Sequence, residues 1–179
     1  MAERDNTIAT LQHMRRVQHL LCDFAIGLLR RGQRHDESKL GPEEKPHFDR
    51  ETPMLSGVDF GSPAYEAALG RLTDALRHHY ASNSHHPEHY PDGIAGMDLY
   101  DLVEMVLDWK ASSERRPIVD MGLEAAFSRF AVEPQLQAII RNTARRSGWL
   151  GDPPDLKSGD LKSIARQGGH DAEEDTPRG

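Results

Sequence analysis

Apolar residues recur at steps of three and four positions along most of this chain, which is the pattern of amphipathic α-helices. The longest such segment is predicted over residues 7–31, with its apolar face at Ile8, Leu11, Met14, Val17, Leu20, Leu21, Phe24 and Leu28. Two arginines, Arg30 and Arg31, suit the negative end of the helix dipole. We expect the helix to end at Gly32, since glycine readily adopts the left-handed cap.

Shorter helical patterns follow over residues 42–49, 62–79, 99–114, 123–130 and 134–147. The second of these could extend to residue 82. Ser62 and Pro63 provide an N-cap and a first-turn proline for the second of these helices, and Asp98 provides an N-cap for the third. No segment alternates between apolar and polar residues for long enough to predict a strand. The sequence therefore predicts an all-α fold.

The composition changes after residue 150, where Gly, Pro, Asp, Lys and Ser dominate and apolar residues almost disappear. Such a segment cannot bury enough apolar surface to fold, so residues 151–179 are expected to form a disordered tail without chemistry. The preceding 1–150 are long enough for a single domain with its own core. We therefore expect one helical domain followed by a polar tail.

Several classes of protein are disfavoured by the bulk properties of the chain. No apolar run approaches the roughly 20 residues that cross a bilayer, and the first residues do not resemble an export signal, so a cytoplasmic protein is expected. The single cysteine, Cys22, has no disulfide partner and is expected to be a small buried residue. A homo-oligomer is compatible with the sequence.

The net charge of −7 argues against extended nucleic acid as the main partner, because binding to a phosphate backbone requires clustered Lys and Arg. A small-molecule substrate is expected instead. Local basic groups, among them Arg30, Arg31 and Arg34, could still hold a single phosphate within an acidic protein.

Histidines are concentrated in one short segment. Five of the ten lie between His78 and His89, and a His35-Asp36 dipeptide lies far upstream. Imidazole is a common ligand for first-row divalent ions, and carboxylates complete mixed nitrogen and oxygen sites. The alternative interpretation is a solvated, histidine-rich helix end. Together with the upstream pair, the segment favours a metal site, and a single cysteine excludes a cysteine-rich one.

The histidines of this segment cannot all bind one ion. If the helix continues through the segment, His78 and His85 lie seven positions apart, while His79, Asn83 and His86 share a neighbouring stripe. We expect one or two histidines to be ligands. The others are expected to contact substrate phosphate or to hold carboxylates that surround the ligands without binding the ion. Lys39 lies three positions after Asp36 and could reach a phosphate held near the ion.

An acidic stripe on the predicted helix 99–114 could complete the site. Its members, Asp101, Glu104 and Asp108, lie roughly opposite the apolar stripe that includes Leu102 and Val106. Such a stripe is usually a solvated face. For these carboxylates to be ligands, they must face a cleft between helices.

The combined motifs resemble a known superfamily. The His35-Asp36 pair followed by a later helical aspartate resembles the HD superfamily of metal-dependent phosphohydrolases, which are compact all-helical proteins that bind one or two divalent ions. The fuller pattern, HDxSK, then HHxxxNxHHxEHY, then EMxxDW, resembles a small, largely uncharacterised family of phages and bacteria. The resemblance covers roughly residues 13–147. A phage-encoded copy would act in the cytoplasm of the host.

The resemblance implies hydrolysis of a small phosphate ester, most often a nucleotide, by water activated on Mn, Co, Zn, Mg or Fe. It implies metal ligands at His35, Asp36, His79, His86 and Asp108, with Asp101 as the alternative to Asp108. His13 or His19 could join the site, because the superfamily places a histidine in the preceding helix. The residues expected to stabilise phosphate charge are Lys39, His78 and His85.

Two other functions remain open at this point. Some helical relatives with a His-Asp core hold a di-iron centre and oxidise their substrates, which would require an apolar substrate pocket. The chain could also be a non-catalytic binding protein stabilised by a structural metal, in which protein ligands saturate the ion.

Overall fold

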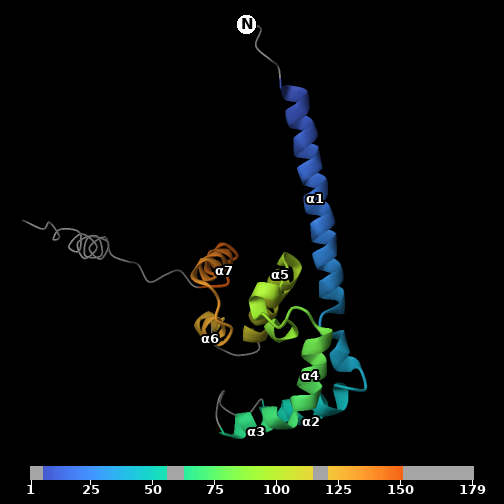
Figure 1. The fold of residues 1–179 in the computed structure, drawn as a ribbon, viewed down its shortest axis with the longest axis vertical. Helices are drawn as coiled ribbons and strands as arrows, with labels where there is room; N and C mark the ends of the chain where they lie inside the picture. The colour runs from blue at the N-terminus through green and yellow to red at the C-terminus, as the bar shows by residue number, and fades with distance from the viewer. Residues whose placement is uncertain (1–5, 56–62, 115–120, 151–179) are drawn as a thin grey trace, which may run out of the picture.

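A computed structural model describes residues 6–55, 63–114 and 121–150, and these ranges contain helices and no strand. The predicted all-α fold is confirmed. The α-helices are α1 (Thr7–Arg34), α2 (Lys45–Leu55), α3 (Pro63–Arg71), α4 (Thr73–Ser82), α5 (Leu99–Ser113), α6 (Leu123–Arg129) and α7 (Pro134–Arg146), joined in part by the short 3-10 helices η1 (Glu37–Leu40), η2 (Pro87–His89) and η3 (Gly93–Gly96) (Figure 1). The predicted tail, 151–179, lies outside the described residues.

The first helix does not end at Gly32 as predicted, but continues to Arg34. An interior glycine costs a helix about 1 kcal/mol relative to alanine. Here, two hydrogen bonds from Arg31 to α5, to Asp101 and Glu104, hold this turn in place. The helix ends instead at His35, which adopts φ −52° and ψ 126°.

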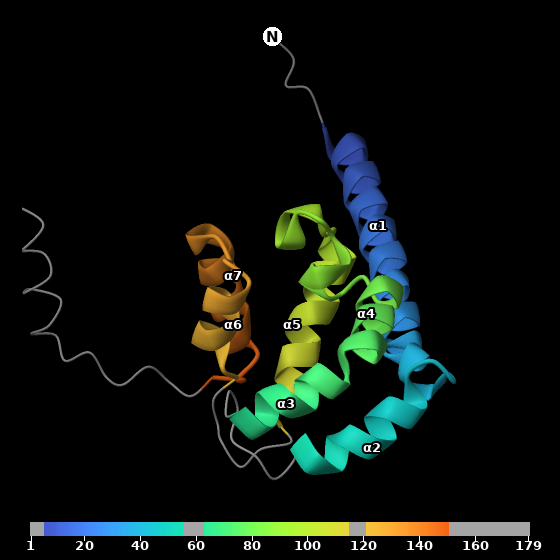
Figure 2. The same ribbon diagram turned by 60° about the horizontal axis from the view of Figure 1, so that its bottom comes forward.

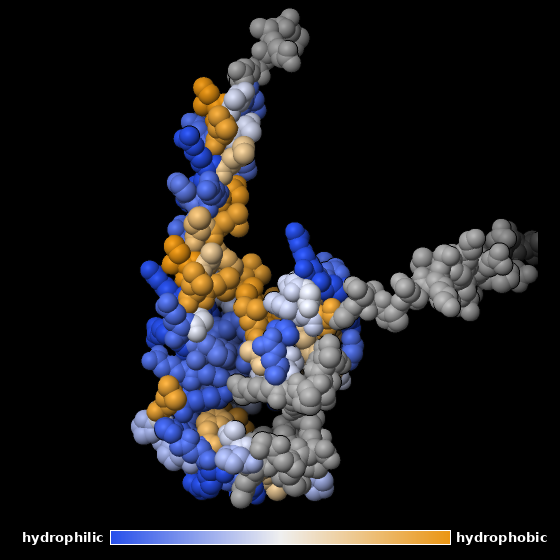
Figure 3. All heavy atoms as spheres, turned by 180° about the vertical axis from the view of Figure 1, so that it is seen from behind, coloured by the Kyte–Doolittle hydropathy of each residue, from blue (hydrophilic) through white to orange (hydrophobic). Residues whose placement is uncertain are grey.

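Only the C-terminal half of α1 packs against another helix. Phe24 stacks on Tyr100 of α5 with ring centroids 4.2 Å apart, and a Cβ on Gly27 would lie 2.6 Å from the Tyr100 ring. Glycine at position 27 thus permits the close approach of the two helices. The N-terminal half extends beyond the other helices, and its apolar residues are exposed (Figures 1 and 3): Ile8, Leu11, Met14, Val17, Leu20 and Leu21. Cys22 is also exposed, contrary to the expectation that it is buried.

The helix predicted from residue 62 is two helices, α3 and α4. They are separated at Leu72, which is buried and has φ −92° and ψ 0°, while the Thr73 hydroxyl donates to the Gly70 carbonyl at 2.7 Å. Helices α2 and α3 pack together at one end of the molecule, and α4 leads from α3 towards the C-terminal end of α1 (Figures 1 and 2). The short helix predicted over 42–49 is displaced and longer, Lys45–Leu55.

The largest apolar core lies between α5, α6 and α7. Its buried members are Met105, Val106, Met121, Leu123, Phe127, Val132, Ile140 and Ala144. The start of α5 is fixed by a capping box, in which Asp98 accepts from the Asp101 amide and Asp101 accepts from the Asp98 amide. This core positions α5, which presents its opposite side to α1 and α4. None of the helices in the described part is long and apolar enough to cross a membrane.

Candidate metal centre

The turn after α1 directs two adjacent side chains to one place. His35 caps the helix, and Asp36 adopts the left-handed conformation with φ 57° and ψ 18°. The Asp36 carbonyl then accepts from the Lys39 amide at 2.9 Å, which begins η1. Aspartate tolerates this conformation better than most residues. Because the backbone reverses at Asp36, both side chains reach the space between α1, α4 and α5.

Four residues form the first candidate ligand group: Asp36, His79, His85 and His86. Their ligand atoms all lie within 4.8 Å of one another. Asp36 Oδ1 is 3.2 Å from His79 Nε2 and 3.5 Å from His85 Nε2, and His86 Nε2 is 2.8 Å from His79 Nε2. His79 and His85 are almost completely buried. The group therefore combines three imidazoles and one carboxylate.

A second candidate group shares one residue with the first. It consists of His35, His85 and Asp108. His35 Nε2 lies 3.6 Å from Asp108 Oδ1 and 3.5 Å from Asp36 Oδ2. One imidazole nitrogen binds one ion, so His85 Nε2 cannot complete both groups at once. Asp36 Oδ1 faces the first group, whereas Asp36 Oδ2 lies near His35 of the second group and forms an ion pair with Lys39 at 2.6 Å.

Two glutamates contact the Nδ1 atoms of three histidines in the candidate groups. Glu104 Oε1 lies 2.9 Å from His35 Nδ1 and 3.3 Å from His85 Nδ1, and Glu44 Oε2 lies 2.9 Å from His79 Nδ1. An ionised carboxylate only accepts hydrogen bonds, so each Nδ1 carries the proton. The Nε2 atoms of His79 and His85 lie on the other side of each ring and face Asp36 Oδ1. Carboxylate–histidine pairs of this kind orient ligands in metal sites.

The spacing of the candidate ligand atoms fits a metal ion. With metal–nitrogen bonds of about 2.1 Å, neighbouring ligands lie about 3.4 Å apart around a tetrahedral ion and about 3.0 Å apart around an octahedral one. The separation of 3.2 Å between Asp36 Oδ1 and His79 Nε2 lies between these values, that of 3.5 Å to His85 Nε2 is slightly longer, and that of 2.8 Å between His79 Nε2 and His86 Nε2 is slightly shorter. Asp36 Oδ1 and His85 Nε2 are also buried polar atoms without a hydrogen-bond partner. A cation among them would satisfy both, so the cluster can hold a metal ion.

The cluster has unusual electrostatics. The carboxylates of Asp108 and Glu104 raise the pKa of His35 to about 10. Burial and the neighbouring His85 and His79 lower the pKa of His86 to about 3. For Asp36, burial acts to raise the pKa, but the neighbouring His79 and the ammonium group of Lys39 outweigh it and hold the pKa well below its usual range. Perturbed groups gathered in one place are typical of functional sites.

The acidic side of α5 is not a solvated face. Glu104 and Asp108 turn towards the histidines, whereas Asp101, the alternative ligand, belongs to neither candidate group. Asp101 is buried and accepts from Arg31 at 2.6 Å, from Ser84 at 2.6 Å and from Tyr90 at 2.7 Å. It therefore anchors the segment that carries His85 and lies outside both candidate ligand groups.

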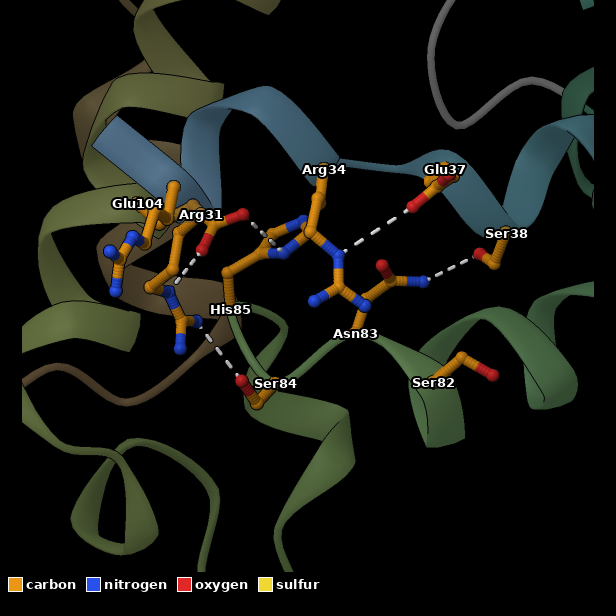
Figure 4. Close-up of a pocket in the computed structure, with 10 residues that line it drawn as sticks. Arg31, Arg34, Glu37, Ser38, Ser82, Asn83, Ser84, His85 and Glu104 are labelled. Atoms are coloured by element: carbon orange, nitrogen blue, oxygen red, sulfur yellow. Dashed lines mark hydrogen bonds and ion pairs between the residues drawn. The ribbon is translucent and has the colours of Figure 1, made fainter. Parts of the chain in front are cut away.

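A polar pocket of about 530 Å³ lies beside the cluster (Figure 4). It is lined by Arg30, Arg31, Arg34, Glu37, Ser38, Ser82, Asn83, Ser84, His85 and Glu104. Figure 4 shows Arg31 directed towards Glu104 and Ser84, and Arg34 directed towards Glu37. The pocket therefore joins a group of arginines to the candidate ligand His85.

Of the three residues predicted to contact phosphate, Lys39 and His78 lie outside the lining of this pocket. Lys39 forms an ion pair with Asp36 Oδ2 at 2.6 Å, and His78 Nδ1 lies 2.7 Å from Glu44 Oε1. Neither lines the pocket. The third, His85, lies among the candidate ligands. That these three residues stabilise phosphate charge stays a prediction, and the pocket beside the cluster is lined by arginines of α1.

The five predicted ligands are all brought into the cluster: His35, Asp36, His79, His86 and Asp108. The additional histidines are not. His13 and His19 lie on the part of α1 that extends from the bundle, and His89 Nδ1 donates to the Tyr80 carbonyl at 2.8 Å. Sequence reasoning missed Glu44, which precedes α2 in a segment rich in glycine and proline and carries no periodic signal.

Comparison with protein families gives a match over residues 2–146, to a family described as a family of unknown function (DUF5662). The chain belongs to this family. The segment matched by DUF5662 includes every residue of the two candidate ligand groups and of the pocket. No curated protein and no solved structure matches the chain.

Proposed function

We propose that this member of DUF5662 is a metal-dependent phosphohydrolase that cleaves a small phosphate ester, with nucleotides as the first class to test. The observation that carries the proposal is the pocket in which three arginines lie beside the candidate ligand His85. A substrate anion bound by the arginines would be brought against the ion. The predicted cytoplasmic location suits such a substrate.

The arginines supply the recognition of phosphate. Arg30 and Arg34 are four positions apart, so they lie on one side of the last turns of α1 and both border the pocket. A guanidinium group donates two parallel hydrogen bonds to phosphate oxygens. Arg31 is already bound to Asp101 and Glu104, so its role is to fix the wall of the pocket.

The ligand set narrows the choice of metal. Three imidazoles and a carboxylate suit Zn, Mn, Fe or Co, whereas Mg prefers a shell of oxygens. A bound ion of this kind supplies Lewis acidity, which polarises a phosphoryl oxygen and lowers the pKa of water. Glu104 and Glu44 orient the histidine ligands, and Lys39 offsets part of the charge of Asp36.

The surroundings of the site favour hydrolysis over the two alternatives. A di-iron oxidase acting on an apolar substrate would need an apolar pocket, but this pocket is lined mainly by arginine, serine, asparagine and glutamate. A purely structural ion is normally enclosed by protein ligands. Here His85 belongs to both the ligand group and the pocket wall, which gives a substrate a route to the ion.

The proposal is tested by loading the purified protein with Mn, Co or Zn and measuring phosphate release from nucleoside phosphates and simple aryl phosphates. Parallel assays without oxygen distinguish hydrolysis from oxidation. We expect metal-dependent release that does not need oxygen and that disappears in Asp36→Asn. A protein that binds metal and releases no phosphate from any ester would contradict the proposal.

A further inference from the structure

Glu44 is a fully buried carboxylate whose two oxygens are both engaged by histidines. Its relative exposure is 0%, Oε1 lies 2.7 Å from His78 Nδ1, and Oε2 lies 2.9 Å from His79 Nδ1. The residue is therefore a buried carboxylate held by two neighbouring imidazoles of one helix.

The two histidines have different surroundings although they are adjacent in α4. His79 is buried and its Nε2 lies 3.2 Å from Asp36 Oδ1, whereas the side chain of His78 is 43% exposed and belongs to neither ligand group. Adjacent residues of a helix point about 100° apart, so both cannot enter the site. Glu44 binds the Nδ1 of each and so fixes which one turns inward.

One donor near His79 Nδ1 would favour the opposite tautomer if Glu44 were replaced. Asn83 Nδ2 lies 3.1 Å away, and its two N–H groups donate to Ser38 Oγ and to the His79 carbonyl. Without Glu44, an N–H group of Asn83 that turned to Nδ1 would make Nδ1 the acceptor, and the proton would move to Nε2. A protonated Nε2 cannot bind a metal. Glu44, an acceptor, acts against this outcome.

We infer that Glu44 is a positioning residue that keeps the proton of His79 on Nδ1 and thereby makes Nε2 the metal-binding nitrogen. His78 is the second donor that holds Glu44 in place. The inference rests on the metal centre of the proposed function and is independent of the reaction catalysed there. Carboxylates with this role in other metal sites change metal affinity by 10–100-fold when they are replaced.

The chain offers a matched control on the same part of the fold. Glu51 of α2 is also buried, with 3% relative exposure, but it binds Arg71 at 2.8 Å and contacts none of the candidate ligands. Glu44→Gln and Glu51→Gln each replace a buried carboxylate by an amide of the same shape. Only the first change alters the partner of a metal-binding histidine.

The experiment is a zinc titration of the full chain and both variants, with helix content followed by circular dichroism. We expect the dissociation constant for Zn to rise about 10–100-fold in Glu44→Gln and to change less than about threefold in Glu51→Gln. Equal affinity of Glu44→Gln and wild type would overturn the inference and leave the proposed function intact. Failure of the wild type to bind any zinc would remove the inference together with the metal centre.

A second measurement needs no variant and so does not depend on the folding of Glu44→Gln. Nitrogen-15 NMR of the zinc-loaded wild type identifies the coordinating and the protonated nitrogen of each histidine. We expect His79 to coordinate through Nε2 with a proton on Nδ1, and His78 to remain unbound to metal. Coordination by His79 Nδ1, or by His78, would show that Glu44 does not have this role.

Discussion

Glu104 Oε1 lies 2.9 Å from Nδ1 of His35, although 69 positions of the chain separate the two residues. The contact joins the end of α1 to the middle of α5. The other oxygen of Glu104 accepts from Arg31 Nε at 2.6 Å, one turn earlier in α1. The Glu104 side chain thus orients the candidate ligand His35 and also holds the end of α1 against α5.

The first prediction concerns this contact. Glu104→Gln keeps the shape of the side chain but loses the charge that Arg31 and His35 share, so we expect metal affinity to fall 10–100-fold. We also expect the metal-free protein to lose about 2 kcal/mol of unfolding free energy. Metal titration and urea denaturation measure the two effects. Glu114→Gln, at the exposed end of α5, is the control and should change neither.

A second prediction separates two requirements at position 36, namely a carboxylate that binds metal and a residue that tolerates the left-handed backbone. Asparagine tolerates the left-handed backbone at φ 57°, whereas alanine adds strain there. We expect Asp36→Asn to abolish metal binding and metal-dependent phosphate release, and to lose the stabilising charge of Asp36 without adding backbone strain. Asp36→Ala should also lose about 1 kcal/mol of stability. Retention of metal by Asp36→Asn would exclude this carboxylate as a ligand.

The arginine pocket gives a third prediction. Replacing Arg30 or Arg34 by alanine removes a cation that would bind substrate phosphate in the ground state, and neither residue contacts the candidate ligand groups. We expect KM to rise about tenfold per variant, equivalent to about 1.4 kcal/mol, with kcat changed much less. Arg15→Ala, on the extending part of α1, serves as the control in the same kinetic assay. An unchanged KM in both pocket variants would mean that substrate binds elsewhere.

Removal of metal supplies a fourth prediction. A ligand that binds only the folded state stabilises it, by about 2.7 kcal/mol at a free concentration 100 times its dissociation constant. We expect zinc to raise the Tm of the wild type and a chelator to reverse the increase. Scanning calorimetry of Asp36→Asn should show no such shift. A zinc-dependent increase in that variant would point to binding at another site.

The fifth prediction concerns pH. Burial acts to raise the pKa of Asp101, but hydrogen bonds from Ser84 and Tyr90, with the charge of Arg31, lower it overall. Its stabilising effect is therefore present above the unfolded-state pKa of about 3.8 and is lost as pH falls through the lower folded-state pKa. We expect Asp101→Asn to be less stable than wild type at pH 7, with a difference that narrows below about pH 4.

Urea denaturation of the metal-free protein between pH 3 and pH 7 measures this difference. Asp74→Asn is the control, because Asp74 and its partner Arg77 are both largely exposed and such pairs contribute little. If the unfolding free energies of Asp101→Asn and wild type differed by the same amount at every pH in this range, the lowered pKa of Asp101 would be contradicted. The metal-free form is used so that competition between protons and metal does not enter the comparison.

The helices and the ligand types could be predicted from the sequence, because both depend on local features. The spacing of apolar residues identified α1, α5, α6 and α7, and the resemblance to the HD superfamily, with imidazole and carboxylate chemistry, identified His35, Asp36 and Asp108 as candidate ligands. That these residues bind metal stays a prediction. The resemblance to HD phosphohydrolases also stays a prediction, since the family match carries no function.

Other features could not be predicted, because they depend on where the backbone turns. We assumed helical spacing between His78 and His86, but α4 ends at Ser82 and Asn83 is extended, with φ −127°. This end directs His85 into the candidate ligand groups, where it also lines the pocket. The burial of Glu44 depends on the packing of η1, α2 and α4, which leaves no pattern in the local sequence.

The candidate ligands come from four separate places: the turn after α1, the helix α4, the segment that follows α4, and α5. An ion shared by Asp36, His79 and His86 would act as a reversible cross-link that closes a loop of roughly fifty residues in the chain. Loss of the ion would lengthen the time that the segments carrying these ligands spend apart. Helices α2 and α3 lie within the loop that the ion would close. Resistance to proteolysis in α2 and α3 would then report how much metal the protein holds.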